Sequence, residues 1–359
     1  MVSTGTSGRA PTDFPDAAES CVLFFLGCER SGTTFVLETF MAHYDVAPGN
    51  ESPWVVRGLC ATRARPPTTR RQQKRFLRSI FSDWYFANQA NYHQVYFEPD
   101  QFLQNGRFDY RQFVEDVFRH IARSKGRRWV MNKTCRFIVH MDAVDEVFNR
   151  PRIVYIVRDG RDVGLSLLQV KAWGPRTVYG AARHWRDQVE AFRSYAERHL
   201  EGRLLTIRYE ELISHPAETF EQIARFYGIF DPARHARLCA ALDVKPANQE
   251  KWRTSFTPAQ LRLFERVAGD ALRAHGYLLG ASEEPLPPLP PVVDMWLRIV
   301  DAVASRLAPD PLRLRALRVV NRVIGQYPAW QQRFFRSQIF SRYFNWNQVL
   351  ARRAQKSTR

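Results

Sequence analysis

Cysteine is scarce in this sequence, and long apolar runs are missing from it. The five cysteines are Cys21, Cys28, Cys60, Cys135 and Cys239. They form no Cys-x-x-Cys pair and no Cys/His group with zinc-ligand spacing, which argues against a disulfide framework and against a metal site. A transmembrane helix needs about 20 mostly apolar residues in succession, and the 359 residues contain no such run.

The first twenty residues also lack an apolar core, so they do not resemble a cleaved secretory signal. Their content of Ser, Thr, Gly, Pro and Asp predicts a flexible tail over 1–20. We therefore expect a cytoplasmic protein.

Acidic residues are outnumbered, with 36 Asp and Glu against 53 Lys and Arg, for a net charge of +17. Most of the excess lies in residues 292–359, which hold thirteen basic and three acidic residues. Such a charge implies an anionic partner. Its confinement to one end, without a recognition motif, argues against a specific nucleic-acid partner. A basic protein that binds nucleic acid or a membrane stays open as an alternative.

Strand and helix patterns alternate along much of the chain. Short apolar runs predict buried strands at 21–27, 128–133, 152–160 and 203–209. Helical spacing or helix-start signals predict helices at 33–44, 138–148, from about 162, 177–200 and 216–229. This order predicts a doubly wound α/β fold with a parallel sheet.

Three regions depart from the alternation. Residues 52–127 are basic in one part and aromatic and polar in another, and we interpret them as an insertion that covers or builds a substrate cleft. A proline-rich hinge is expected at 283–293. Residues 294–359 are basic and aromatic, and they predict a mainly helical appendage. This segment either packs on the preceding part of the chain, which is the favoured interpretation, or lies on an anionic membrane surface.

A modified phosphate loop follows the first strand. The sequence reads Gly27-x-x-x-x-Gly32 and then Thr33 and Thr34, where a nucleotide-binding P-loop would have lysine and then a hydroxyl residue. Glycine-rich backbone before a helix is suited to anions. Arg30 can supply the charge of the missing lysine.

A second motif, "VYIVRDGRDVGLSLL", places Arg158 at a strand end and Ser166 about two turns into the next helix. The carboxyl ends of parallel strands line one crevice, so Arg30 and Arg158 are expected to face the same nucleotide. The alternative for Arg158 alone is a surface arginine paired with Asp159 or Asp162.

The three motifs "RSGTT", "IVRDGRDVGLS" and "IRYEELISHP" occur in an order that resembles the sulfotransferases that use 3′-phosphoadenosine 5′-phosphosulfate (PAPS). The resemblance covers roughly residues 21–280 and implies a P-loop-like three-layer αβα catalytic domain (21–282). It also implies PAPS as cosubstrate. The implied nucleotide contacts are Arg30, Ser31, Gly32, Thr33 and Thr34 at the phosphosulfate, Arg158 and Ser166 at the 3′-phosphate, and Tyr209 near the adenine. A closing segment contains Trp252, and its Lys245 and Arg253 are further candidate contacts of the 3′-phosphate.

The catalytic base is not the histidine of cytosolic sulfotransferases, because Lys133 and Thr134 are followed here by Cys135. The pattern is closer to the branch that includes the tyrosylprotein sulfotransferases, which uses a glutamate. That resemblance implies Glu51 as the base and Lys133 as a group that stabilises the leaving oxygen. No metal is expected.

The sequence thus predicts sulfuryl transfer from PAPS to an acceptor hydroxyl of a carbohydrate, glycolipid or other metabolite. A P-loop kinase or NTPase is the second alternative, disfavoured by Thr33 in the lysine position and by the lack of a clear acidic magnesium ligand after a second strand.

Overall fold

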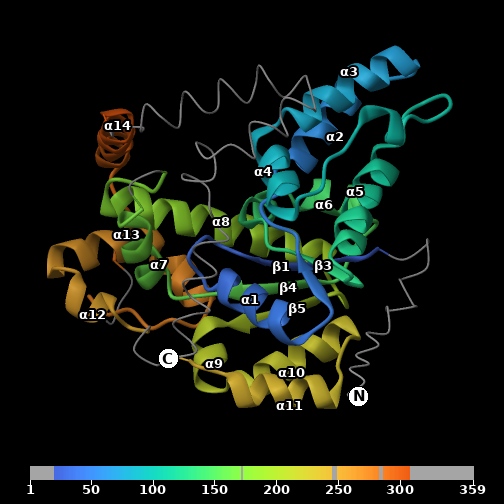
Figure 1. The fold of residues 1–359 in the computed structure, drawn as a ribbon. Helices are drawn as coiled ribbons and strands as arrows, with labels where there is room; N and C mark the ends of the chain where they lie inside the picture. Colours follow the sequence, from blue (N-terminus) through green and yellow to red (C-terminus); the bar gives the residue numbers. More distant parts are fainter. Residues whose placement is uncertain (1–19, 171–172, 245–248, 283–285, 308–359) are drawn as a thin grey trace.

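The computed structural model describes residues 20–170, 173–244, 249–282 and 286–307. Within them, five parallel strands form one sheet in the spatial order β2-β3-β1-β4-β5 (Figure 1). The strands are β1 (Val22–Gly27), β2 (Val46–Pro48), β3 (Trp129–Asn132), β4 (Ile153–Val157) and β5 (Leu204–Arg208). The predicted α/β fold with a central parallel sheet is confirmed.

The sequence of β1 shows how one strand supports two hydrophobic cores. All six of its residues are buried. Phe24 and Leu26 join one cluster, whereas Leu23 and Phe25 join the other. Successive side chains of a strand point to opposite faces, so a continuous apolar run fills both sides of the sheet.

Helices cover both faces and give the predicted three layers (Figure 1). One face carries α1 (Thr33–His43), α9 (Tyr209–Ser214), α10 (Pro216–Tyr227) and α11 (Pro232–Ala241). The other carries α5 (Tyr110–Ser124), α6 (Met141–Val147), α7 (Gly160–Leu168), α8 (Val178–His199) and α13 (Pro258–Ala274).

Two short elements differ from the predicted pattern. The three-residue strand β2 was not predicted, because three residues are too few to show a period. The helix predicted at 138–148 divides into a 3-10 turn, η2 (Cys135–Val139), and α6.

Residues 52–127 are mostly helical, which the sequence pattern did not predict. They form α2 (Trp54–Ala64), α3 (Arg70–Phe81), α4 (Trp84–His93), the 3-10 turn η1 (Pro99–Phe102) and α5. Their aromatic residues pack together: the Trp54 ring lies 5.0 Å from that of Phe86 and 6.2 Å from that of Phe113. The aromatic composition that broke the strand–helix alternation is therefore the core of this helical unit. Its description as an insertion stays a prediction.

The C-terminal part of the described chain contains α12 (Trp252–Ser255), α13 and α14 (Pro291–Leu307). Helix α14 begins inside the predicted hinge 283–293, with proline at its first position, which suits a helix start. The last three residues of the predicted hinge, 291–293, are therefore helical, and the hinge itself stays a prediction. Residues 308–359, most of the predicted appendage, and the tail 1–19 lie outside the described residues.

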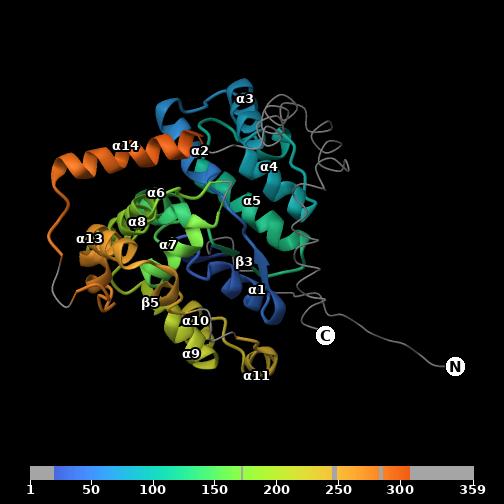
Figure 2. The same cartoon turned by 90° about the vertical axis from the view of Figure 1, so that its left-hand side faces the viewer.

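Helix α14 packs on α8 (Figure 2), and several of its apolar side chains are exposed. Asp294 accepts a hydrogen bond from Tyr179 at 2.7 Å, and Asp301 accepts one from Thr177 at 2.6 Å. The exposed apolar side chains are Val292, Val293, Met295, Trp296, Ile299 and Val303. No helix in the described part of the chain combines the length and apolar content of a membrane span.

A buried histidine makes the fold sensitive to acid. His93, at the end of α4, is 2% exposed, and burial lowers its pKa to about 3, with the Lys125 charge adding to the effect. In the unfolded chain a histidine has a pKa of about 6.5. Between these values the unfolded state binds a proton that the folded state does not, so stability falls as pH drops.

We predict a loss of about 2 kcal/mol in the free energy of unfolding between pH 6.5 and pH 5 from His93, measured by urea unfolding. The variant His93→Gln should flatten this dependence. His215→Gln, at an exposed position, is the control and should leave the dependence as it is. An equally steep loss in His93→Gln would contradict the assignment.

Candidate functional site

The residues implicated from the sequence follow the carboxyl ends of the strands. Cys28 follows β1, Gly49 follows β2, Lys133 follows β3, Arg158 follows β4 and Tyr209 follows β5. Because the strands are parallel, these positions share one edge of the sheet, and β3 and β4 flank β1 there. Ligands of open α/β sheets bind at such a crevice.

The loop between β1 and α1 takes an unusual backbone path. Arg30 has φ 72° and Gly32 has φ 92°, both in the left-handed region. A Cβ atom on Gly32 would lie 2.7 Å from the Tyr209 ring, so only glycine fits there without a shift. The loop is therefore fixed both by conformation and by contact with the end of β5.

The loop ends in a helix N-terminus that lacks a side-chain cap. Gly32 is the N-cap of α1 and provides no side-chain hydrogen bond to the first turn. The buried Ser31 hydroxyl oxygen has no hydrogen-bond partner among the described residues. Backbone N–H groups at a helix start favour anions. The Ser31 N–H is used within the loop, where it donates to the Cys28 carbonyl oxygen at 3.2 Å. The Ser31 hydroxyl and the uncapped start of α1 are therefore the groups that the loop offers to a ligand.

The two sequence motifs meet at Arg30. Its Nε donates a hydrogen bond of 2.8 Å to the Ser166 hydroxyl oxygen on α7. Arg158 donates to the Arg30 carbonyl oxygen at 3.1 Å. The structure therefore brings Arg30, Arg158 and Ser166 together. That they face one nucleotide stays a prediction.

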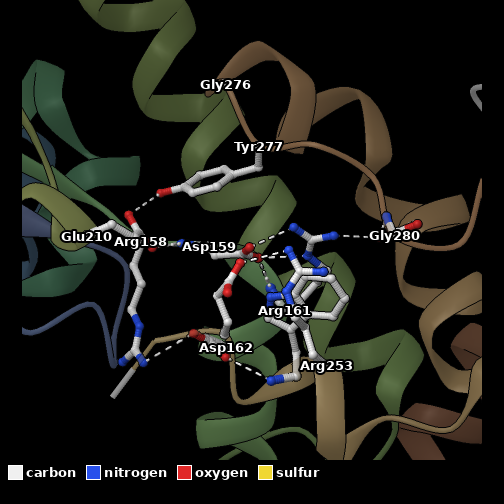
Figure 3. A network of polar contacts seen from close by, with 12 residues as sticks. Arg158, Asp159, Arg161, Asp162, Glu210, Arg253, Gly276, Tyr277 and Gly280 are labelled. Atoms are coloured by element: carbon white, nitrogen blue, oxygen red, sulfur yellow. Dashed lines mark hydrogen bonds and ion pairs between the residues drawn. The ribbon is translucent and has the colours of Figure 1, made fainter. Parts of the chain in front are cut away.

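Arg158 lies beside the Asp162 carboxylate (Figure 3) and also packs against the Tyr209 ring. Its guanidinium is 3.6 Å from the Asp162 carboxylate and 4.2 Å from the centre of the Tyr209 ring. Burial raises the pKa of Asp162, and the nearby Arg158 charge opposes that effect. Tyr209 begins α9 and is 6% exposed, packed between Gly32 and Arg158.

The closing segment, which contains Trp252, is connected to the surroundings of Arg158 through Asp162. The Trp252 backbone N–H donates to the Asp162 carboxylate at 3.1 Å. The Trp252 ring is 3% exposed, with the guanidinium groups of Arg161 and Arg253 at 3.7 and 4.5 Å from its centre. Arg253 is exposed and pairs with Glu250 at 2.8 Å. Lys245, the remaining predicted contact, lies outside the described residues.

A buried ionic network behind Arg158 was not predicted (Figure 3). Arg161 pairs with Asp159 and with Glu265, each at 2.7 Å. Glu210 accepts hydrogen bonds from the Asp159 backbone N–H at 3.1 Å and from the Tyr277 hydroxyl at 3.0 Å. The sequence feature that could have indicated this network is the alternation of basic and acidic residues in "RDGRD", directly after a buried strand.

Glu51 and Lys133, which the resemblance implies as catalytic residues, also contact each other. Lys133 Nζ lies 3.0 Å from Glu51 Oε1. The backbone around them is tied together, since the Ser52 N–H donates to the Thr134 hydroxyl oxygen at 2.7 Å. Burial lowers the pKa of Lys133, but the Glu51 charge, the nearby Cys135 and the hydrogen bond to Glu51 together outweigh burial, and the pKa of Lys133 is raised overall.

Cys135, in the position of the histidine of cytosolic enzymes, is buried beside Thr33. Its thiol is 3.9 Å from the Thr33 hydroxyl oxygen. Burial raises the pKa of Cys135 far above its ordinary value, and the Glu51 charge adds to that effect. Such a thiol is a poor base, in agreement with its interpretation as a packing residue.

Glu29, in the loop between β1 and α1, contacts two residues of α8. The sequence did not predict these contacts. The Glu29 carboxylate accepts a hydrogen bond from Gln188 at 2.8 Å and lies 3.0 Å from a ring nitrogen of His184. Burial alone raises the pKa of Glu29, but these contacts outweigh it and the pKa is lowered. Potential ligand atoms of Cys28, Glu29 and His184 lie within 4.8 Å of one another. Burial raises the pKa of the Cys28 thiol well above its usual range, which disfavours the thiolate that a metal would require.

Comparisons with known proteins identify the protein family to which the chain belongs. A model described as the sulfotransferase family matches residues 23–232, more than half of the chain. The chain therefore belongs to the sulfotransferase family, and the predicted PAPS-dependent sulfotransferase is confirmed as the class of enzyme. No curated protein matches the chain significantly.

Solved sulfotransferases are also similar. STF9 from Mycobacterium avium shares 16% identity, covering 74% of this chain and 80% of its own, with a TM-score of 0.42. The sulfotransferase domain of the Synechococcus PCC 7002 olefin synthase shares 17%, covering 70% and 96%, with a TM-score of 0.43. Mouse SULT7A1, solved in complex with PAP, shares 14%, covering 71% and 86%, with a TM-score of 0.42. The family assignment rests on the family model.

We predict that Gly32→Ala destabilises the protein more than glycine replacement at another left-handed position. Gly106 has φ 80° and nothing within 4 Å of an added Cβ, so Gly106→Ala is the matched control. Gly106→Ala should lower the free energy of unfolding by about 1–2 kcal/mol, because of backbone strain alone. Gly32→Ala should lower it by about 1–3 kcal/mol more, because the added Cβ meets the Tyr209 ring. Urea unfolding measures both, and equal losses would contradict the contact.

Proposed function

We propose that this protein transfers a sulfuryl group from PAPS to an acceptor hydroxyl, with Glu51 as the base. The observation that carries the proposal is the convergence of two groups at one edge of the sheet. Arg30, Ser166 and Arg158 form one of them, and the ion pair of Glu51 and Lys133 forms the other.

The residues at the edge fit a nucleotide with phosphates at two ends. The uncapped start of α1, the Ser31 hydroxyl and Arg30 would hold the 5′-phosphosulfate. Arg158 and Ser166 would hold the 3′-phosphate, which ATP lacks. Contacts with adenine are assigned to Tyr209, and the segment with Trp252 and Arg253, together with Lys245, would cover the nucleotide.

When bound, PAPS supplies an activated sulfuryl group to the attacking oxygen. Glu51 would accept the proton of the acceptor hydroxyl at its carboxylate as the new S–O bond forms. Protonation weakens the attraction of Glu51 for Lys133, so the ammonium of Lys133 becomes available to the departing phosphate oxygen. Arg30 and the loop N–H groups would share that charge, because such transfers depend on positioning and electrostatic stabilisation.

A carbohydrate or glycolipid hydroxyl is the proposed acceptor, and a cytoplasmic location remains our expectation. The exposed apolar face of α14 supports the alternative of a peripheral membrane contact, with an anionic surface as partner. A P-loop kinase is disfavoured because Thr33, not lysine, follows Gly32. No metal enters the proposed mechanism, and no nucleic acid is proposed as a partner.

Glu51→Gln tests the base. The substitution keeps the shape and removes the proton acceptor, so turnover with PAPS and an accepted hydroxyl should fall at least about 100-fold. Affinity for 3′,5′-phosphoadenosine (PAP), measured by calorimetry, should stay within about threefold of that of the unmodified protein. Glu201→Gln, at an exposed turn, is the control. Turnover close to normal in Glu51→Gln would exclude this role.

Arg158→Ala tests the nucleotide. We expect PAP binding to weaken by more than about tenfold, because a charged hydrogen-bond donor is lost. Arg152→Ala is a matched control at the opposite end of β4, where Arg152 donates to the Phe226 carbonyl oxygen. Calorimetric competition with Mg–ATP completes the test. If Mg–ATP binds and PAP does not, the kinase alternative replaces the proposal.

A further inference from the structure

A large basic cavity lies beyond the residues described so far. Its volume is about 1440 Å³, and its walls come from α2, α3, α4, η2 and the segment after α7. The lining residues are Arg57, Arg70, Arg71, Lys74, Arg75, Arg78, Ser79, Ser82, Asp83, Trp84, Tyr85, Arg136 and Trp173. Neither the phosphate loop nor Arg158 belongs to this lining, so the cavity is separate from the proposed nucleotide site.

Seven of the lining residues are cationic and one is acidic. Two of the cations have acidic partners: Arg57 pairs with Asp83 at 2.5 Å, and Lys74 pairs with Asp100 at 2.6 Å. No ion pair with another described residue neutralises the remaining five, which are Arg70, Arg71, Arg75, Arg78 and Arg136. The cavity therefore presents a net positive charge to whatever enters it.

Helix α3 arranges most of this charge on one face. Arg71, Lys74, Arg75 and Arg78 have the spacing of neighbours on a helix surface, whereas Leu77 and Ile80 are buried on the opposite face. Like charges at this spacing destabilise a helix. A capping box between Thr69 and Gln72 fixes where the helix starts. The row of cations suits a ligand with repeated negative groups.

Several residues that line the cavity are close in sequence to the residues of the proposed reaction centre. Arg136 follows Lys133 by three residues, a separation of at most about 11 Å. Arg57 lies in the first turn of α2, which begins three residues after Glu51. Trp173 follows α7, the helix that carries Ser166. An acceptor in the cavity can therefore extend toward the Glu51–Lys133 pair.

Aromatic side chains complete the lining. Tyr85 and Trp173 are exposed, at 37% and 57%, and Trp84 lines the cavity beside Tyr85. Flat aromatic faces pack against the apolar faces of sugar rings, and arginine forks bind carboxylate and similar oxyanions. The combination favours an anionic sugar over a simple inorganic ion.

We propose that this cavity binds an acidic oligosaccharide, so that the acceptor carries its own negative groups beside the hydroxyl to be sulfated. This inference rests on the proposed function, and it narrows the acceptor from any hydroxyl compound to a polyanionic glycan. The α3 cations hold the negative groups, and Arg136 contacts the part of the sugar nearest to Lys133.

The test uses tetragalacturonate and its methyl ester, two oligosaccharides that differ in charge. Calorimetry measures binding of each to the full chain in the presence of PAP. The triple variant Arg71→Gln/Arg75→Gln/Arg78→Gln should weaken tetragalacturonate binding by about tenfold or more. It should leave PAP affinity unchanged. The methyl ester should bind at least about tenfold more weakly than the acid.

The control removes the same number of exposed charges from α13, which lies far from α3 (Figure 1), as Arg262→Gln/Arg266→Gln/Arg273→Gln. It should change tetragalacturonate affinity by less than about threefold. Equal losses in both triple variants would overturn the cavity assignment in favour of diffuse attraction. Equal affinity for acid and ester, or α3-dependent binding of phosphatidylglycerol vesicles without oligosaccharide binding, would also overturn it.

The measurements distinguish a failure of the acidic-acceptor proposal from a failure of the proposed sulfuryl transfer. If PAP binds and tetragalacturonate does not, the acidic acceptor is excluded while the nucleotide assignment stands. If tetragalacturonate binds in the expected pattern and PAP does not, the cavity stands as a glycan site and the sulfuryl transfer proposal falls.

Discussion

The whole site depends on five strands running in the same direction. A parallel sheet collects the residues that follow its strands at one edge, whatever their separation in the chain. Arg30 and Ser166 are 136 positions apart and Glu51 and Lys133 are 82 apart, yet each pair is in hydrogen-bond contact. A sheet with antiparallel strands would distribute the same segments over two edges.

Buried charge is tolerated near this edge because each ion has partners. The Arg161 side chain is only 3% exposed, and the side chains of its two acids, Asp159 and Glu265, are 10% and 0% exposed. Glu265 also accepts hydrogen bonds from the backbone of Gly280 and Ala281. An unpaired ion in such a position would be strongly destabilising. The network therefore fixes where α7, α13 and the following turn lie behind Arg158.

The sequence was most informative where a pattern is continuous. The strands β1 and β4 and the loop around Arg30 were predicted, because buried apolar runs and glycine spacing are local signals. The contact of Glu51 with Lys133 could not follow from spacing, although resemblance named both residues. Strand β2, which carries Glu51 to the edge, was too short to detect. The partners of Glu29 come from α8, and only the folded chain brings them to the loop.

The segment between β2 and β3 begins and ends on neighbouring, hydrogen-bonded strands. It contains Glu51 near its start and all the basic residues of α3, but none of the residues assigned to the nucleotide. The segment leaves β2 at the carboxyl edge of the sheet and enters β3 at the opposite edge, and its last helix, α5, packs on β3. The helices before α5 can be lengthened, shortened or replaced with less effect on that framework. On the proposed assignment, selection can act on acceptor recognition through these helices while the residues assigned to the donor stay unchanged. The same division marks α2, α3 and α4, which precede α5, as the part to exchange when the proposed acceptor range is to be redesigned.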